Sequence, residues 1–148
     1  MLKVMLGLAV AAGLLFAQET NARTLPGLAG VAVPASDAAC FVSSNGVMRN
    51  NCTSKADLAF ALPVDSHGLK VISLTASATG PSTNVGCNAY AVNRDGTIAS
   101  STVGYWLNQF GPVVTMTMSA INVPINGTLY VSCYVGPGGR IYGVEYNQ

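Results

Sequence analysis

The sequence predicts an all-β fold, a disulfide-stapled antiparallel β-sandwich of about seven to nine strands. Three observations support this prediction. Short segments that alternate apolar and polar residues are separated by turn residues roughly every eight to twelve positions, which is typical of sandwiches and barrels. The chain contains four cysteines. Beyond residue 22, no segment keeps helical periodicity for about three turns.

Residues 1–22 have the pattern of a secretory signal peptide. Lys3 supplies a positive charge, residues 4–17 are an unbroken apolar run, and the small residue Ala22 precedes the expected cleavage site. The apolar run is shorter than the roughly 20 residues that a membrane-spanning helix needs. We therefore expect cleavage after Ala22, no stable membrane insertion afterwards, and a secreted, periplasmic or cell-surface location.

The rest of the chain has the length of one domain. We expect residues 23–37 to form an extended N-terminal segment and residues 38–148 to form the β-sandwich.

The first predicted element is a hairpin between two cysteines. Cys40 and Cys52 flank two short strand-like segments joined by Asn45-Gly46, a dipeptide typical of hairpin turns. A loop centred on Gly46 would pair Ser44 with Met48 and place the two cysteines opposite each other, at a separation that a disulfide tolerates. In an exported chain, four cysteines predict two such bridges, so Cys40 is assigned to Cys52.

The next predicted strands run from residue 57 to residue 103. Residues 57–64 alternate leucine and phenylalanine with alanine, and Pro63 favours a strand end. Residues 69–79 alternate apolar side chains with serine and threonine until Gly80-Pro81 ends the strand. Residues 85–91 place Cys87 on an apolar face, and after the turn Asn93–Gly96 the chain returns along residues 97–103.

Three further strands complete the prediction. Residues 113–121 alternate apolar with hydroxyl side chains, and Asn126-Gly127 marks another hairpin turn. Residues 129–135 place Cys133 on the apolar face of their strand. Glycines and a proline at 136–139 lead into the last strand, residues 141–146.

Cys87 and Cys133 form the second predicted bridge, which would join distant strands through the core of the sandwich. By loop entropy, the shorter bridge contributes roughly 3 kcal/mol and this longer one roughly 4 kcal/mol. The arrangement resembles an immunoglobulin domain, and the resemblance implies the same general architecture. It extends no further, because Trp106 comes too late after Cys87 and Val131 stands where that family has its tyrosine.

Charged residues are sparse, with seven Lys and Arg against six Asp and Glu and a net charge of +1. They form no basic stripe of the kind that nucleic-acid binding needs, and no polybasic segment that would hold an anionic membrane. A neutral surface leaves binding to uncharged polymers and self-association possible.

Catalysis has little support in the sequence. His67 is the only histidine, and it lies in the turn Asp65-Ser66-His67-Gly68, whose adjacent residues cannot form a triad with one another. With both disulfides formed, no thiol is left as a nucleophile. We expect a protein that is not an enzyme, with a hydrolase that uses His67 as an alternative.

No metal or cofactor is expected. Asn93, Asp95 and Gly96 match the middle of a calcium loop, but Ala91 and Thr102 occupy positions that require acidic ligands. A hairpin turn accounts for the same residues.

Aromatic and amide side chains gather in one segment, Tyr105, Trp106, Asn108, Gln109 and Phe110. Aromatic faces stack on the apolar faces of sugars, and amides reach sugar hydroxyls, so this segment is the candidate binding site. The alternative is that its rings cap one end of the core. The tyrosines of the expected final hairpin are a further candidate contact face; they are Tyr130, Tyr134, Tyr142 and Tyr146.

These observations favour a secreted, non-enzymatic β-sandwich that acts as a structural or interaction module at the cell surface. Its expected partners are an extracellular polysaccharide, other surface proteins or further copies of itself. A carbohydrate-binding module that uses the Tyr105–Phe110 segment is the alternative function.

Overall fold

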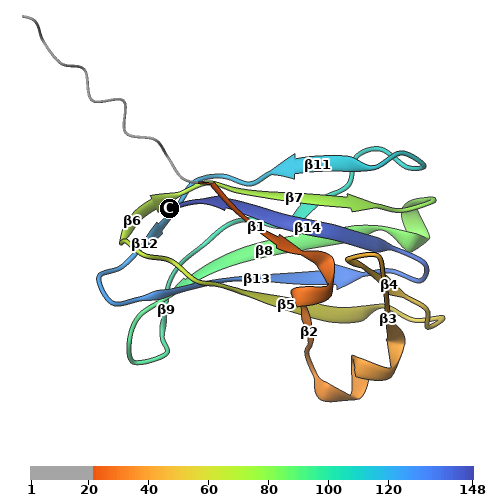
Figure 1. Ribbon diagram of the computed structural model, residues 1–148, viewed down its shortest axis with the longest axis horizontal. Helices are drawn as coiled ribbons and strands as arrows, with labels where there is room; N and C mark the ends of the chain where they lie inside the picture. The colour runs from red at the N-terminus through yellow and green to blue at the C-terminus, as the bar shows by residue number, and fades with distance from the viewer. Residues whose placement is uncertain (1–21) are drawn as a thin grey trace, which may run out of the picture.

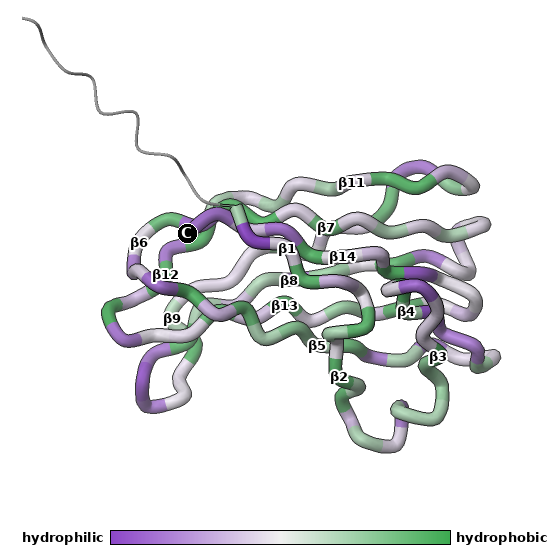
Figure 2. The backbone as a smooth tube through the Cα atoms, in the orientation of Figure 1, coloured by the Kyte–Doolittle hydropathy of each residue, from purple (hydrophilic) through white to green (hydrophobic). Residues whose placement is uncertain are grey.

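Alternating burial along the strands builds two antiparallel sheets that pack face to face (Figure 1). The computed structural model describes residues 22–148, so the predicted signal peptide, apart from Ala22, lies outside the described residues. Hydrophilic residues concentrate in the turns, whereas the strands carry most of the apolar positions (Figure 2). The predicted all-β sandwich is confirmed.

Within residues 22–148, the first sheet, sheet A, has six strands. In spatial order five of them are β11 (Val114–Thr117), β7 (Ile72–Ser77), β14 (Arg140–Asn147), β4 (Val47–Asn50) and β3 (Phe41–Ser44). The sixth, β1 (Ala22–Pro26), pairs with β14.

Sheet B likewise has six strands among the described residues. In spatial order five of them are β10 (Tyr105–Trp106), β8 (Val85–Val92), β13 (Thr128–Val135), β5 (Ala56–Leu62) and β2 (Val31–Ala32). The sixth, β9 (Ile98–Ser101), pairs with β8. Residues 23–37 therefore supply β1 to sheet A and β2 to sheet B.

The remaining elements are short. A two-stranded sheet pairs β6 (Gly68–Lys70) with β12 (Ile121–Val123). Three short 3₁₀ helices are described, η1 (Gly27–Ala29), η2 (Ala35–Cys40) and η3 (Pro81–Thr83). Within residues 22–148, no helix has the length and apolar character that crossing a membrane requires.

The core lies between sheets A and B and is filled by every second residue of their strands. Phe60 of β5, Leu74 of β7 and Val131 of β13 are fully buried. The predicted alternation therefore placed these side chains on the correct face.

The predicted disulfide Cys40–Cys52 is present, but the hairpin register differs from the expected one. Ser44 pairs with Val47 instead of Met48, so the turn contains only Asn45 and Gly46. Both residues have positive φ, 51° and 82°, as a two-residue type I′ turn requires.

The second predicted disulfide, Cys87–Cys133, is also present, yet it does not join the two sheets. The two cysteines are direct cross-strand partners on the neighbouring strands β8 and β13, with Cα atoms 4.1 Å apart. Both point into the core, as predicted. The expectation of a bridge across the sandwich was wrong, because inward faces alone do not say which sheet a strand belongs to.

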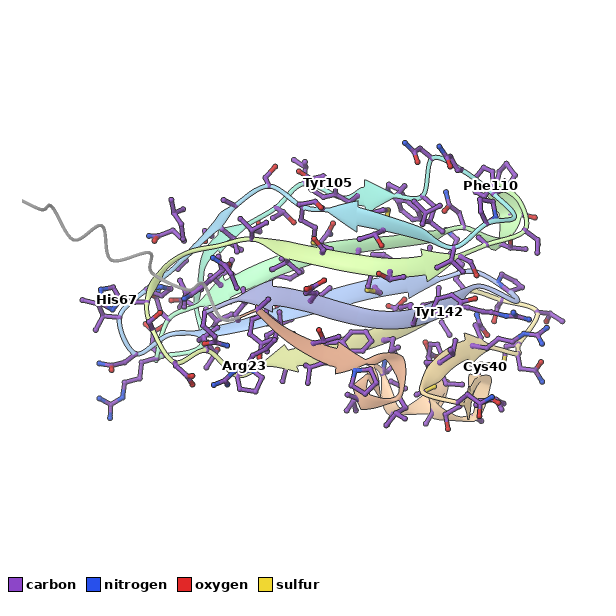
Figure 3. The ribbon with its side chains drawn as sticks, turned by 45° about the horizontal axis from the view of Figure 1, so that its top comes forward. Arg23, Cys40, His67, Tyr105, Phe110 and Tyr142 are labelled. Atoms are coloured by element: carbon purple, nitrogen blue, oxygen red, sulfur yellow. A yellow bond between two sulfur atoms is a disulfide. The ribbon has the colours of Figure 1, made fainter. Side chains whose placement is uncertain are left out.

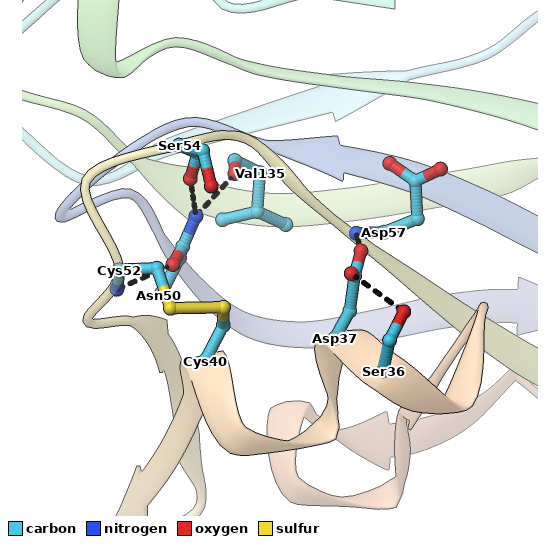
Figure 4. The surroundings of a disulfide bond; sticks show 8 residues. All are labelled: Ser36, Asp37, Cys40, Asn50, Cys52, Ser54, Asp57 and Val135. Carbon is cyan, nitrogen blue, oxygen red and sulfur yellow. Dashed lines mark hydrogen bonds between the residues drawn. A yellow bond between two sulfur atoms is a disulfide. The ribbon is translucent and has the colours of Figure 1, made fainter.

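A buried asparagine connects the two sheets instead (Figure 4). Asn50, at the end of β4 in sheet A, is fully buried, and its Nδ2 donates to the carbonyl oxygen of Val135, at the end of β13 in sheet B, over 2.7 Å. The same amide nitrogen donates to the Ser54 carbonyl oxygen over 2.8 Å, and Oδ1 accepts from the Cys52 N–H over 2.9 Å. One side chain thus links the loop beside the Cys40–Cys52 bridge to the end of β13 in the opposite sheet.

The last two strands do not form the expected hairpin. β13 lies in sheet B and β14 in sheet A, so the chain crosses between the sheets at residues 136–139. A bulge in β14 near Tyr142 shifts the alternation by one residue. Tyr146 is therefore buried, with its hydroxyl donating to the Pro63 carbonyl oxygen over 2.8 Å. The expected single tyrosine face does not form, because Tyr130 and Tyr134 lie on sheet B and Tyr142 lies on sheet A.

Candidate functional site

The outer face of sheet B carries aromatic side chains from three adjacent strands. Trp106 lies on β10, Tyr90 on β8, and Tyr130 and Tyr134 on β13. The register brings them together, because Trp106 and Tyr134 both pair with Gly86, and Tyr90 pairs with Tyr130. We call these four residues the aromatic face.

Gly86 gives the Trp106 indole its position. A Cβ atom at residue 86 would lie 2.4 to 2.7 Å from three atoms of the fused ring, so the indole lies with one face against the glycine backbone. The other face is open, and the residue is 48% exposed. Large rings are usually covered in folded proteins, and a tryptophan laid flat on a sheet presents an unusual apolar surface to solvent.

The four rings are arranged as two parallel pairs. Trp106 and Tyr134 have centroids 6.4 Å apart and planes inclined by 11°, which makes them laterally offset neighbours. Tyr90 and Tyr130 are stacked more closely, with centroids 4.9 Å apart and planes inclined by 17°. Tyr134 is 44% exposed, so the Trp106–Tyr134 pair is the more accessible of the two.

Polar groups lie between the two aromatic pairs. Asn88 of β8 and Ser132 of β13 are cross-strand partners, and both are partly exposed. The Asn88 Nδ2 donates to the Tyr90 hydroxyl oxygen over 3.1 Å. Within residues 22–148, the Trp106 indole N–H has no hydrogen-bond partner, so it is free to donate to a ligand.

A carboxyl group borders the aromatic face. Asp57 of β5 is the cross-strand partner of Tyr134. Burial raises the pKa of the Asp57 carboxyl above its ordinary value, and the nearby charge of Asp37 raises it further. Burial also raises the pKa of the Tyr130 hydroxyl, with Tyr90 as a second cause, so this phenol stays neutral at physiological pH.

In the structure, the side chains of the predicted binding segment, residues 105–110, do not lie on one surface. Trp106 faces outward and is exposed, whereas Tyr105 and Phe110 pack partly against the core. Phe110 lies toward one end of the sandwich (Figure 3). The Tyr105 hydroxyl oxygen accepts from the Ser119 N–H over 2.8 Å and contacts the Ser119 hydroxyl. Asn108 and Gln109 are exposed in the loop after β10.

Sequence reasoning missed Tyr90 and Asn88 as members of the site. Both alternate with buried residues on β8, so the pattern showed that they face outward. It could not show that β10 and β13 flank β8 and bring Trp106 and Tyr134 to the same surface.

His67 lies at the opposite end of the sandwich from Phe110 (Figure 3). It lines a pocket of about 210 Å³ with Asp65, Ser66 and Asn126. Among the described residues, no side chain forms a hydrogen bond with the imidazole, and no group of three or more His, Cys, Asp or Glu is placed to hold a metal ion.

No protein-family model matches the sequence, and no curated protein sequence matches it. Solved structures with the same fold are found. A GH26-CBM35 β-(1,4)-mannanase from Podospora anserina has a TM-score of 0.57 at 8% identity, over 86% of this chain and 28% of that one. A Paenibacillus cycloisomaltooligosaccharide glucanotransferase complexed with cycloisomaltoheptaose has a TM-score of 0.53 at 10% identity, over 85% of this chain and 18% of that one.

An isomalto-dextranase from Arthrobacter globiformis T6, complexed with panose, has a TM-score of 0.52 at 11% identity, over 84% of this chain and 23% of that one. The chain therefore spans less than a third of the length of each of these three proteins. At such identities the likeness establishes the sandwich fold.

Proposed function

We propose that the chain is a non-enzymatic carbohydrate-binding module that holds a neutral polysaccharide on the aromatic face. The observation that carries the proposal is the Trp106 indole, with one face fixed against Gly86 and the other open to solvent. A sugar ring presents C–H groups on its faces and hydroxyls around its edge. An aromatic ring with polar neighbours matches both features.

The arrangement of the site suits an extended ligand. Trp106 and Tyr134 provide two offset parallel rings, which allow neighbouring sugar units of one chain to stack side by side. Asn88, Ser132 and the indole N–H lie next to these rings and supply hydrogen-bonding groups for hydroxyls. The Asp57 carboxylate beside Tyr134 disfavours an anionic ligand here, which makes a neutral polysaccharide the better match.

The comparisons support this proposal indirectly. Each of the three related structures is named as an enzyme that acts on a saccharide, and the sandwich forms less than a third of each. A region of that size fits an accessory role, in which the sandwich binds the saccharide and another part of the enzyme catalyses the reaction. The two disulfides of this chain fit an extracellular setting, where such polymers are found.

A structural or interaction module is the second candidate function. β2 is an edge strand of sheet B; Val31, its first residue, is 66% exposed, and Val33, directly after it, is 52% exposed. Exposed apolar residues at a strand edge favour pairing with another protein or with a second copy.

Binding to immobilised neutral polysaccharides, such as β-mannan, β-glucan and dextran, tests the proposed function. We expect the native protein to be retained on at least one of them, and Trp106→Ala to weaken retention by about tenfold or more, the loss typical of removing an aromatic anchor. Leu69→Ala is the control, because Leu69 of β6 is 68% exposed and lies outside the aromatic face, so this variant should bind normally. Equal binding by native protein and Trp106→Ala, or no binding to any neutral polysaccharide, would contradict the proposal.

A further inference from the structure

The outer face of sheet A carries a second pocket, on the other side of the sandwich from the aromatic face. Its volume is about 420 Å³, and β3, β4, β14 and the loops beside them line it. Two guanidinium groups, those of Arg49 and Arg140, belong to the lining. Tyr142, Val42 and Val47 supply apolar surface, and polar side chains complete the pocket; they are Ser44, Asn45 and Asn51.

The two arginines are direct cross-strand partners, Arg49 on β4 and Arg140 on β14. Like charges in this position repel each other and destabilise a sheet. Within residues 22–148, the ion pair found joins Arg23 to Asp65, and neither Arg49 nor Arg140 has a carboxylate or hydrogen-bond partner. A chain with only seven basic residues thus places two of them side by side without a neutralising group.

We propose that this pocket, the arginine pocket, binds the carboxylate or sulfate group of an acidic glycan. A guanidinium donates two parallel hydrogen bonds to such an oxyanion, and an anion between two guanidiniums also removes their mutual repulsion. The proposal does not rest on the proposed function of the aromatic face, because the two sites share no residue and lie on different sheets.

The size and lining of the pocket favour an anion carried on a sugar. A volume of about 420 Å³ far exceeds that of an isolated carboxylate and falls in the range of pockets that hold small organic molecules. Tyr142 offers a ring to the apolar side of a sugar, and the asparagines offer amides to its hydroxyls. A nucleic acid is disfavoured, because the net charge is only +1 and no basic stripe extends from the two arginines.

Isothermal titration calorimetry at low ionic strength tests the proposal with pairs of matched ligands. Oligogalacturonate is compared with its methyl ester, and a sulfated galactan oligosaccharide with its desulfated form. We expect at least one acidic ligand to bind about tenfold or more tightly than its uncharged counterpart, as hydrogen bonds to a charged group imply. Binding of the carboxylate or of the sulfate alone supports the proposal and identifies the anion.

Two single variants with the same change in net charge give the control. Arg140→Gln should weaken binding of the acidic ligand by about tenfold or more, whereas Arg94→Gln, in an exposed turn, should not change it. Arg49→Gln combined with Arg140→Gln should fold normally, because both side chains are exposed and their repulsion is removed. Trp106→Ala should keep acidic-ligand binding, which separates this site from the aromatic face.

Three results would overturn the proposal. In the first, no acidic glycan binds more tightly than its uncharged form. In the second, Arg94→Gln weakens binding as much as Arg140→Gln does. In the third, poly-glutamate binds as tightly as the acidic glycans, which shows attraction to charge without recognition of a sugar.

Discussion

Gly86 and Trp106 determine each other's environment on the aromatic face. The glycine lacks a side chain at the point where the indole crosses β8, and the indole covers its backbone. Gly86 is buried although it belongs to the outer face of the sheet. A residue with a side chain would lift the ring away from the sheet and change the surface that it presents.

Gly86→Ala should displace the indole, because the new Cβ atom would lie 2.4 Å from two ring atoms. We expect a red shift of tryptophan emission, weaker binding of the neutral polysaccharide and a loss of stability of roughly 1–3 kcal/mol. Fluorescence and urea unfolding measure these effects. Gly80→Ala is the control, since a Cβ atom there meets nothing within 4 Å. Unchanged emission in Gly86→Ala would show that Gly86 does not position the indole.

At the scale of residues, much of the burial pattern could be predicted from the sequence. Leu58, Phe60 and Cys133 face the core as their alternation indicates, because the side-chain period of a strand is two. Tyr146 does not follow its alternation, since the bulge near Tyr142 adds one residue to β14. A bulge depends on the partner strand, so β14 read by itself gave no sign of it.

At the scale of elements, the pairing of strands could not be predicted. The sequence indicates where β8 and β13 lie and that Cys87 and Cys133 face inward, but the same pattern fits strands in one sheet or in two. The turn at residues 136–139 was expected to close a hairpin, and in the structure it crosses between the sheets. The aromatic face arises from strand order, which explains why only Trp106 among its residues was in the predicted segment.

Asn50 links the two sheets where the chain crosses between them, and its removal should be costly. Asn50→Ala would leave the Val135 and Ser54 carbonyl oxygens and the Cys52 N–H without their present partner. We expect a loss of roughly 2–4 kcal/mol in the free energy of unfolding, measured with urea.

Asn122→Ala, at an exposed position on β12, is the control for Asn50→Ala and should change the free energy of unfolding by less than about 0.5 kcal/mol. If the two substitutions lower the free energy of unfolding equally, the hydrogen bonds of Asn50 between the sheets do not contribute to stability.

At the scale of the whole molecule, the two proposed sites carry charged groups of opposite sign. The aromatic face has Asp57 at its border, and the arginine pocket on sheet A contains Arg49 and Arg140. The first environment favours neutral sugars and the second favours acidic ones. A sandwich with both sites would hold two different glycans on its two outer faces.

Titration of the intrinsic fluorescence with neutral polysaccharides tests the central claim most directly, because Trp106 is the only tryptophan of the chain. With 48% of the residue exposed, the free protein should emit at a wavelength typical of a partly hydrated indole. A polysaccharide stacked on the aromatic face should shift this emission to the blue and protect it from acrylamide quenching. Emission and quenching that stay the same with every neutral polysaccharide, including any that retains the protein, would contradict the account.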